Sequence, residues 1–393
     1  MPSPHAFIVT YGGGHAQIGA ALAREWVQQG GKVTVLALTT ASAVYQDAGI
    51  PTLGMRDLPE CQSDSVLAWG ARLAGDVTRH PDVPEGETEA YLGAGMSDLI
   101  EDVGEEEALR RFREKGRTAF LPHKTLARVL DRIQPDIVVA TNSPRAEMAA
   151  LRAARAKGIP SLFVADLFVG PELDRLGATD YADVACVLAE SEKRHLVAAG
   201  WDPAHVRVTG NPAFDGLSQP VNVEAGQAWR EQLGHAGPVV LWASQPGVIN
   251  PDFSRDVARR LAEAGGQQDW KVVWRPHPNE EEPPIIPGVL YSQRDEPLEP
   301  LLYGVDVVVV VSSTVGLQAA LAHRRVAQLD VPVPFHSAPY SAMGIAERAC
   351  GPEDLPRAIS AALDKPTPNG DFLPECGQAT QRVVDAMHDL LRA

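Results

Sequence analysis

Short apolar runs alternate with amphipathic stretches along the first half of the chain. The apolar runs occupy residues 6–10, 32–38, 136–140, 161–165 and 183–188. Between the first two runs, residues 16–29 place Ile18, Leu22 and Trp26 roughly on one face at helical spacing. Valine-rich runs flanked by helices are typical of a parallel sheet that is covered on both faces. The pattern therefore predicts an α/β fold.

The second half repeats the same alternation. Its apolar runs occupy residues 239–243, 270–275, 305–311 and 325–329. A single hydrophobic core rarely serves 393 residues, so we expect two domains. We place an N-terminal lobe at 1–217, a C-terminal lobe at 218–372, and a last helix within 373–393 that packs back on the first lobe. Residues 216–222 are polar and contain proline, and we interpret them as the linker.

Residues 61–118 depart from this pattern. They are rich in Glu, Gly and Pro and contain no clear strand. Helical spacing is visible over 87–96 and 105–115. We expect a helical insertion in the first lobe, on the side where the ligand binds.

The charge balance argues against nucleic acid as a partner. The chain has 51 acidic and 35 basic residues, which gives a net charge of −16. A nucleic-acid-binding protein usually shows a basic stripe. The densest basic cluster, residues 110–117, follows three glutamates and is better interpreted as a solvated helix face. A phosphorylated ligand would have to be bound locally, by helix N-termini and a few cations.

Cysteine usage and hydropathy favour a cytoplasmic protein. The four cysteines form no CxxC pair, so neither a zinc site nor a redox motif is indicated. Few cysteines in a long chain are typical of a reducing compartment. We find no signal peptide, and no apolar run reaches the roughly 18 residues of a membrane span.

The first candidate motif is Gly12-Gly13-Gly14-His15, between the first strand and the first helix. Glycines let the backbone approach a ligand closely, and a helix N-terminus suits an anion. Open α/β sheets bind ligands at the carboxyl ends of their strands, where His15 would accept a proton from a hydroxyl. A tight turn with His15 as a cap is the plainer alternative.

The second motif, Arg275-Pro276-His277-Pro278, also follows a strand. The prolines stiffen the loop, while Arg275 and His277 would meet a phosphate and neutralise charge on a departing nucleotide. A structured loop with a solvent-facing histidine is the alternative.

The third motif is Ser312-Ser313-Thr314-Val315-Gly316, at the start of a helix. Three hydroxyls exceed what one N-cap needs and would bind phosphate oxygens. Gly316 would keep the first turn uncrowded, and Gln318 on the same turn would reach a sugar hydroxyl. A simple N-cap is the alternative.

Several weaker candidates complete the predicted site. On the donor side they are Ser244 after a strand and the turn with Gly210 and Asn211; on the acceptor side they are Asn142, Ser143, Arg145 and Glu147. Asp166, which also follows a strand, is a reserve catalytic base. For most of these, structural capping is an equally good explanation.

Other chemistries are not indicated. The sequence has no GxSxG elbow, no HExxH, no EF-hand loop and no DxD. A mechanism without a metal is the simpler assumption, so we predict no metal ligands and no cofactor.

Together these motifs resemble those of the GT-B superfamily. GGGHAQI resembles the glycine-rich loop of inverting GT-B glycosyltransferases, and VTGNPAFD is similar to the lobe-junction turn there and in UDP-N-acetylglucosamine 2-epimerases. RPHPN followed by SSTVGLQAA is similar to the donor-phosphate motifs of capsule-type and teichoic-acid transferases and of the 2-epimerases. The epimerases' Arg-Pro-Glu loop at the first strand and their His-Val-Glu-Ala-Gly segment have no clear counterpart here.

The resemblance implies two Rossmann-like lobes with parallel sheets facing across a cleft. It further implies a glycosyltransferase, inverting and metal-independent, that takes a nucleotide-sugar as co-substrate, UDP-linked or otherwise CMP- or CDP-linked. The acceptor would be a carbohydrate, a lipid-linked molecule or a small molecule. His277 and the hydroxyls would hold the donor phosphate, and His15 would act on the acceptor. Two alternatives remain: a 2-epimerase-like epimerase or hydrolase, and a non-catalytic sugar-nucleotide-binding protein.

Overall fold

A computed structural model gives the structure of the chain. It describes residues 3–75, 80–177, 180–246, 250, 252–277, 279–280, 282–293, 295–332, 338–366 and 373–392. The chain divides into two compact units. Unit 1 comprises residues 1–213 and 378–393, and unit 2 comprises residues 214–377.

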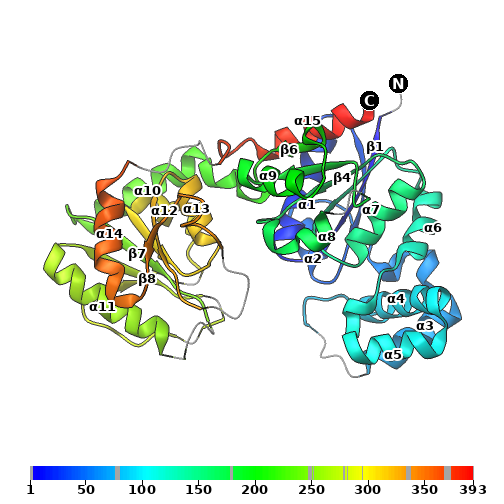
Figure 1. The fold of residues 1–393 in the computed structure, drawn as a ribbon, viewed down its shortest axis with the longest axis horizontal. Coiled ribbons are helices and arrows are strands. Elements are labelled where there is room, and N and C mark those ends of the chain that lie inside the picture. Colours follow the sequence, from blue (N-terminus) through cyan, green and yellow to red (C-terminus); the bar gives the residue numbers. More distant parts are fainter. Residues whose placement is uncertain are drawn as a thin grey trace. The chain divides into compact units, whose positions relative to one another are not determined.

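Unit 1 is built on a six-stranded parallel sheet (Figure 1). Its strands are β1 (His5–Thr10), β2 (Lys32–Ala37), β3 (Ile137–Thr141), β4 (Ser161–Val164), β5 (Val184–Val187) and β6 (Val206–Val208). They lie in the order β2-β1-β3-β4-β5-β6. Because β2 lies on one side of β1 and β3 on the other, the order of the strands reverses at β1, which is where open α/β sheets bind ligands.

Alternate side chains of this sheet enter two different cores. Ala6 and Ile8 of β1 pack with α1 (Gly14–Gln28), α2 (Ala41–Asp47) and α15 (Ala379–Arg392). Phe7 and Val9 face the opposite core, which contains residues of α6 (His123–Ile133), α7 (Ala146–Ala156), α8 (Leu173–Leu176) and α9 (Glu190–Ala198). The two-residue period of a strand thus fills both sides, as the apolar runs require.

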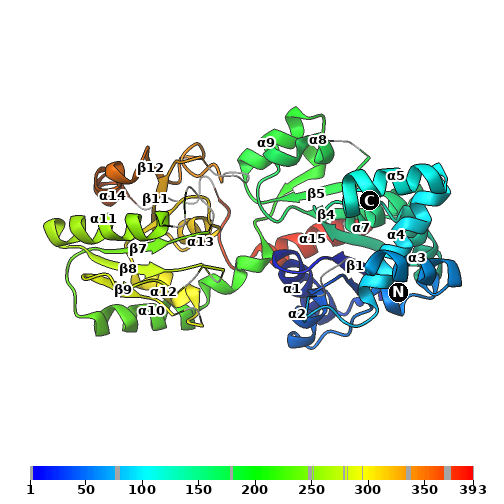
Figure 2. The same ribbon diagram turned by 90° about the horizontal axis from the view of Figure 1, so that it is seen from below.

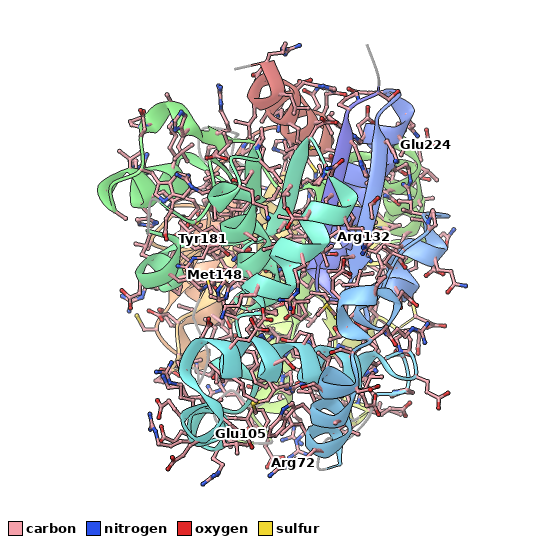
Figure 3. The ribbon with its side chains drawn as sticks, turned by 90° about the vertical axis from the view of Figure 1, so that its right-hand side faces the viewer. Arg72, Glu105, Arg132, Met148, Tyr181 and Glu224 are labelled. Carbon is pink, nitrogen blue, oxygen red and sulfur yellow. The ribbon has the colours of Figure 1, made fainter. Side chains whose placement is uncertain are left out.

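A helical subdomain lies beyond the carboxyl ends of these strands. It contains α3 (Asp64–Ala74), α4 (Glu87–Val103) and α5 (Glu105–Lys115), and the short 3₁₀ segments Met55–Asp57, Pro59–Cys61 and Gly116–Ala119 adjoin it. In Figure 3, Arg72 and Glu105 mark α3 and α5 at the lower end of the unit, and Met148 marks α7 against the sheet. The side chains of α4 are buried along most of its length, so it joins the subdomain to the core of unit 1.

Unit 2 has a second six-stranded parallel sheet. Its strands are β7 (Val239–Ala243), β8 (Lys271–Arg275), β9 (Val289–Tyr291), β10 (Val307–Val310), β11 (Arg325–Leu329) and β12 (Glu347–Ala349). The order is β12-β11-β10-β7-β8-β9, so the reversal lies between β7 and β10.

Helices cover this sheet on both faces (Figure 2). One face packs against α11 (Phe253–Gln268) and α14 (Leu355–Asp364). The helices α10 (Pro220–Leu233), α12 (Leu298–Gly304) and α13 (Val315–Leu321) lie on the other. The predicted α/β fold class is therefore confirmed in both units.

The linker expected at 216–222 is wrong in detail. Residues Pro212–Ser218 form 3₁₀ turns, and α10 begins at Pro220. Proline is favoured in the first turn of a helix, where its missing N–H costs nothing. The polar composition reflects the exposed surface of α10, of which Gly226 is the buried member.

Neither a membrane-spanning helix nor a metal cluster is found in the described ranges. None of their helices is both long enough and apolar enough to cross a bilayer. They contain no group of three or more His, Cys, Asp or Glu side chains arranged to hold a metal ion.

Candidate functional site

His15 lies where the strand order of unit 1 reverses. It is the second residue of α1, directly after the turn that leaves β1. Gly13 is the N-cap of α1 with φ 67° and ψ −139°, a backbone conformation that residues other than glycine rarely adopt. Gly14 is the first helical residue. The glycines thus aim His15 at the neighbouring strand β3.

A buried hydrogen-bond chain fixes the tautomer of His15. Its Nδ1 lies 2.6 Å from the Thr141 hydroxyl, at the end of β3. Thr141 donates its own proton to Oε2 of Glu147. The threonine oxygen must therefore accept from Nδ1–H of His15, which leaves Nε2 with a free lone pair. A histidine held in this way is suited to act as a general base at Nε2.

Glu147 is fully buried, so it does not line a binding surface as predicted. Besides Thr141, it accepts hydrogen bonds from the backbone N–H groups of Tyr11 at 2.7 Å and Ser143 at 3.2 Å. Burial raises the pKa of Glu147, and the nearby His15 and the hydrogen bonds oppose that rise. Glu147 is therefore connected to His15 through Thr141 and has no exposed surface to offer a ligand.

Asp166 lies on the other side of the imidazole. Its Oδ2 is 3.8 Å from Nε2 of His15, and both side chains are partly exposed. Asn142 accepts from the Asp166 backbone N–H at 2.8 Å, and Asn211 donates to the Asp166 carbonyl. Asn142 and Asn211 are themselves buried, so they position this loop. Gly210, with φ 80°, forms the turn before Asn211.

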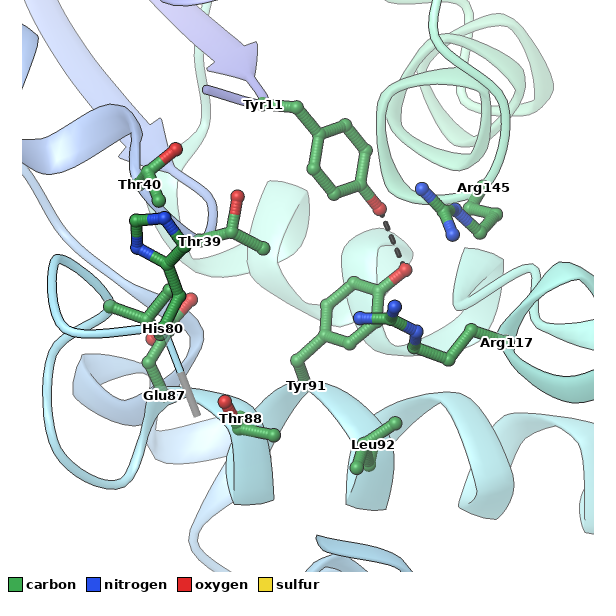
Figure 4. Close-up of a pocket in the computed structure, with 11 residues that line it drawn as sticks. Tyr11, Thr39, Thr40, His80, Glu87, Thr88, Tyr91, Leu92, Arg117 and Arg145 are labelled. Atoms are coloured by element: carbon green, nitrogen blue, oxygen red, sulfur yellow. Dashed lines mark hydrogen bonds between the residues drawn. The ribbon is translucent and has the colours of Figure 1, made fainter. Parts of the chain in front are cut away.

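A cavity of about 370 Å³ lies in the same unit, and Tyr11, the residue before the glycine-rich turn, is one of its lining residues (Figure 4). We call it the arginine pocket, and its principal lining residues are Tyr11, Thr39, Thr88, Tyr91, Arg117 and Arg145. Tyr11, Thr39 and Arg145 follow the ends of β1, β2 and β3, whereas Thr88 and Tyr91 lie on α4. The pocket thus lies between the sheet edge and the helical subdomain of unit 1.

The sequence motifs of unit 2 also meet where its strand order reverses. Gln245, two residues after β7, joins Ser312, which follows β10. Oε1 of Gln245 accepts from the Ser312 backbone N–H at 3.0 Å, and its Nε2 lies 3.0 Å from the Ser312 hydroxyl. The predicted hydroxyl cluster is therefore anchored across β7 and β10.

The remaining residues of this cluster differ in their roles. The Ser313 hydroxyl accepts from the Val315 N–H at 3.3 Å, whereas Thr314, the N-cap residue of α13, is exposed and makes no side-chain cap hydrogen bond. Gly316 is buried, and a Cβ there would meet Tyr340 and Val310 at 2.8 Å. Gly316 therefore serves close packing. Gln318 is half-buried and makes no side-chain hydrogen bond within the described ranges.

Glu280 organises the loop that follows β8. Its carboxylate accepts from the hydroxyls of Ser244 at 2.5 Å and Ser254 at 2.6 Å, and from the His277 backbone N–H at 2.8 Å. Ser244 also accepts from the indole N–H of Trp274 at 2.8 Å. The hydroxyl of Ser244, predicted to bind the donor, thus already has partners within the unit.

His277 and Arg275 have different hydrogen-bond partners and therefore different roles. Nδ1 of His277 accepts from the Asn279 N–H at 3.1 Å, so the neutral ring carries its proton on Nε2 and can donate there. Arg275 instead binds the Ser292 hydroxyl and the Glu296 carbonyl, both at 2.8 Å. Burial lowers the pKa of Arg275. Pro278 lies outside the described residues.

A second cavity of about 370 Å³ lies in unit 2. Gln245, Ser254, Trp274 and Glu280 are among its lining residues. It therefore adjoins both the Gln245–Ser312 bridge and the His277 loop.

Sequence reasoning missed the partners that make these motifs work. Thr141, Gln245 and Glu280 were not singled out, although each follows a predicted strand by a few residues. That position was a usable signal. Tyr91 and Arg117 carried no such signal, because they belong to the insertion and reach the site only through the folding of α4 and the 3₁₀ turn after α5.

Several solved structures that are similar to this chain are UDP-GlcNAc 2-epimerases. No protein-family model and no curated protein matches the sequence. A UDP-GlcNAc 2-epimerase from Methanocaldococcus jannaschii has 14% identity and a TM-score of 0.63, covering 98% of this chain and 99% of that one. The 2-epimerase from Neisseria meningitidis bound to UDP-GlcNAc has 14% identity, a TM-score of 0.59 and coverages of 98% and 100%.

A transferase is among the similar structures as well. The glycotransferase of kitacinnamycin has 15% identity and a TM-score of 0.55, covering 99% of this chain and 95% of that one. At such identities the likeness shows the fold alone. The two parallel six-stranded sheets and the likeness to these structures over nearly the whole chain confirm the predicted α/β fold with two lobes.

Proposed function

We propose that this protein is a glycosyltransferase that moves a sugar from a nucleotide-activated donor, a UDP-sugar, to a hydroxyl acceptor. One observation carries the proposal: His15, whose Nδ1 is held by Thr141, follows the same glycine-rich turn that Tyr11 precedes, and Tyr11 lines a cavity of about 370 Å³ in this unit. A base in the same unit as an empty space of this size suits a second substrate. An enzyme acting on the donor alone needs no such space.

The chemistry follows from the tautomer of His15. Nε2 accepts the proton of the acceptor hydroxyl as its oxygen attacks the anomeric carbon, and the nucleoside diphosphate departs with the bonding electrons. The resulting imidazolium is stabilised by Glu147 through Thr141, in the manner of a buried acid that orients a catalytic histidine. A single direct displacement inverts the anomeric centre.

Unit 2 would hold the departing diphosphate. The hydroxyls of Ser313 and Thr314 and Nε2–H of His277 are donors that suit phosphate oxygens. Ser312 would set the position of this segment through Gln245. The cavity lined by Trp274 and Gln245 would take the nucleoside.

A 2-epimerase-like activity is the second candidate. It is favoured by the similar structures, several of which are described as UDP-GlcNAc 2-epimerases. Such an enzyme converts the sugar on the donor without an acceptor. The two candidates therefore differ in what happens when only the donor is supplied.

The test measures UDP release from a panel of UDP-sugars with and without a mixture of hydroxyl acceptors. A His15→Gln variant should lose about 10²- to 10⁴-fold in turnover while UDP binding is unchanged. His205→Gln, at a histidine outside the site, is the control. Full activity in His15→Gln would overturn the assignment of the base. An altered UDP-sugar formed without acceptor, seen by NMR, would select the epimerase.

A further inference from the structure

The arginine pocket of unit 1 contains two cations, Arg117 and Arg145, that lack a counter-ion among the residues the structure describes. Within the described ranges, neither Arg117 nor Arg145 has a carboxylate within ion-pair distance, whereas Arg110, Arg111 and Arg132 nearby all do. Nε of Arg145 is buried and has no hydrogen-bond partner in that part of the chain. Arg117 is exposed, whereas Arg145 is half-buried. In a protein with a net charge of −16, it is the buried Nε of Arg145, with no hydrogen-bond partner among the described residues, that calls for a local explanation.

The two guanidinium groups converge on the tyrosine pair. Figure 4 shows both directed toward Tyr91, whose hydroxyl lies 2.7 Å from that of Tyr11. Burial raises the pKa of Tyr91, and Arg145 and Arg117 partly oppose that rise, as cations close to the phenol must. Cζ of Arg145 also lies 5.1 Å from the centre of the Tyr11 ring.

The acidic residue of the cavity does not neutralise this charge. Glu87 lines the same pocket, but its two carboxylate oxygens accept from the backbone N–H groups of Met55 and Arg56, both at 3.1 Å. Burial raises the pKa of Glu87. The cavity therefore offers an anion neutral phenols and two guanidinium groups that no described carboxylate neutralises.

The backbone at the rim is held in an unfavourable conformation. Thr39 and Arg145, which follow β2 and β3, have φ values of 55° and 76°. A β-branched residue at positive φ is a true outlier, and such positions cluster where a side chain must be aimed at a ligand. Two of the five non-glycine residues with positive φ among the described residues line this one cavity.

We infer that the arginine pocket binds an anionic group, a carboxylate or a phosphate, on a hydroxyl-bearing acceptor. Arg117 and Arg145 pair with the anion, and the faces of the two tyrosines contact the body of the molecule. Tyr11 and His15 flank the same glycine-rich turn, and both are tied to Glu147. An anion held in the pocket therefore places the rest of the acceptor beside the base. That the ligand is the acceptor rests on the proposed function, whereas the binding of an anion does not.

The test uses the full chain without nucleotide and measures binding by NMR and calorimetry. Glucuronate and glucose 6-phosphate are compared with glucose, which has the same ring without the charge. We expect one or both anions to bind, and we expect glucose not to bind. Comparison of glucuronate with glucose 6-phosphate decides whether the pocket prefers a carboxylate or a phosphate. Added salt should weaken the binding.

Arginine variants locate the binding. Arg117→Gln and Arg145→Gln should each weaken it about tenfold or more, because a charge-assisted hydrogen bond is lost. Arg113→Gln, at an exposed arginine of α5, is the matched control. The inference would be overturned if glucose bound as well as the anions, or if neither anion bound at millimolar concentration. Unchanged binding in both arginine variants would also overturn it.

The outcome is separable from that of the proposed function. UDP binding is measured in the same variants and should be unchanged, which also shows that they are folded. If the anions bind through the arginines but no transfer occurs, the pocket stands and the transferase proposal falls. If transfer occurs and the anions do not bind, the transferase proposal stands and the inference about the arginine pocket falls.

Discussion

At the scale of single residues, the central feature is how a buried acid reaches the candidate base through a threonine. Glu147 has no exposed surface, yet its hydrogen bond from Thr141 decides which nitrogen of His15 carries the proton. Replacement of Thr141 by valine would remove that hydroxyl and leave His15 free to take either tautomer.

The burial of Glu147 predicts a pH dependence of stability. Its pKa is raised above the ordinary value of 4.5, so above that pH the native state keeps a proton that the unfolded chain releases. Stability therefore falls as pH rises through this window, by at most about 1.4 kcal/mol per pH unit. Glu147→Gln should remove that part of the slope, as measured by urea unfolding between mildly acidic and neutral pH. Parallel curves for the two proteins would contradict the prediction.

The strained backbone at Arg145 gives a second prediction. Arg145→Ala and Arg145→Gly remove the same side chain, but alanine retains the unfavourable φ of 76° and ψ of −115°. We expect the glycine variant to be more stable than the alanine variant by about 1 kcal/mol, in spite of the entropy of glycine in the unfolded chain. Chemical denaturation measures the difference. An alanine variant as stable as the glycine variant would mean that the backbone is not strained there.

At the scale of elements, α15 joins unit 1 across the whole length of the chain. Its buried side chains, among them Val383 and Met387, enter the core formed with α1 and β1. The ring of His388 stacks on Trp26 of α1, with centroids 4.7 Å apart. The last helix is therefore part of the first unit rather than an appendage.

Truncation of a buried side chain on α15 should destabilise unit 1. Met387→Ala leaves a cavity in this core and should lower the free energy of unfolding by about 2–4 kcal/mol. Asp385→Ala, at an exposed position of the same helix, should change it by less than about 0.5 kcal/mol. Equal effects of the two substitutions on the unfolding midpoint would show that α15 contributes little to the core.

Strands with a run of apolar residues were predictable, whereas the shortest strands and several helices were not. The runs that predicted β1, β7 and β10 are Val- and Ile-rich, and the structure has strands there. The three-residue strands β9 and β12 are too short for a two-residue period to be visible. Helix α3 was missed as well, and two of its three buried residues, Gly70 and Ala74, are small residues that leave little hydrophobic pattern.

At the scale of the whole molecule, each unit has a core of its own. The buried residues of β7 to β11 pack with α11 and α14 and share no cluster with those of unit 1. A ligand of one unit should therefore act on the stability of that unit. Under the proposed function, the nucleotide belongs to unit 2.

This separation gives a prediction for nucleotide binding. UDP at a hundred times its dissociation constant should stabilise the unit that binds it by about 2.7 kcal/mol. His277→Ala should lose most of this effect, whereas His15→Gln should keep it. A thermal-shift series with UDP, CMP, CDP, GDP and dTDP measures this. A shift that persists in His277→Ala would remove His277 from the phosphate site.

The sequence by itself determined the alternation of strands and helices, because burial on both faces of a parallel sheet demands apolar runs at regular intervals. It also determined that His15, His277 and the 312–314 hydroxyls follow strands, because the residue after a strand is fixed by chain order. Only the tertiary structure decided which strands are neighbours, and therefore that Thr141 meets His15 and that Gln245 meets Ser312. It alone turned Glu147 inward and brought Arg117 to Arg145, since contacts between distant segments depend on packing that no local pattern records.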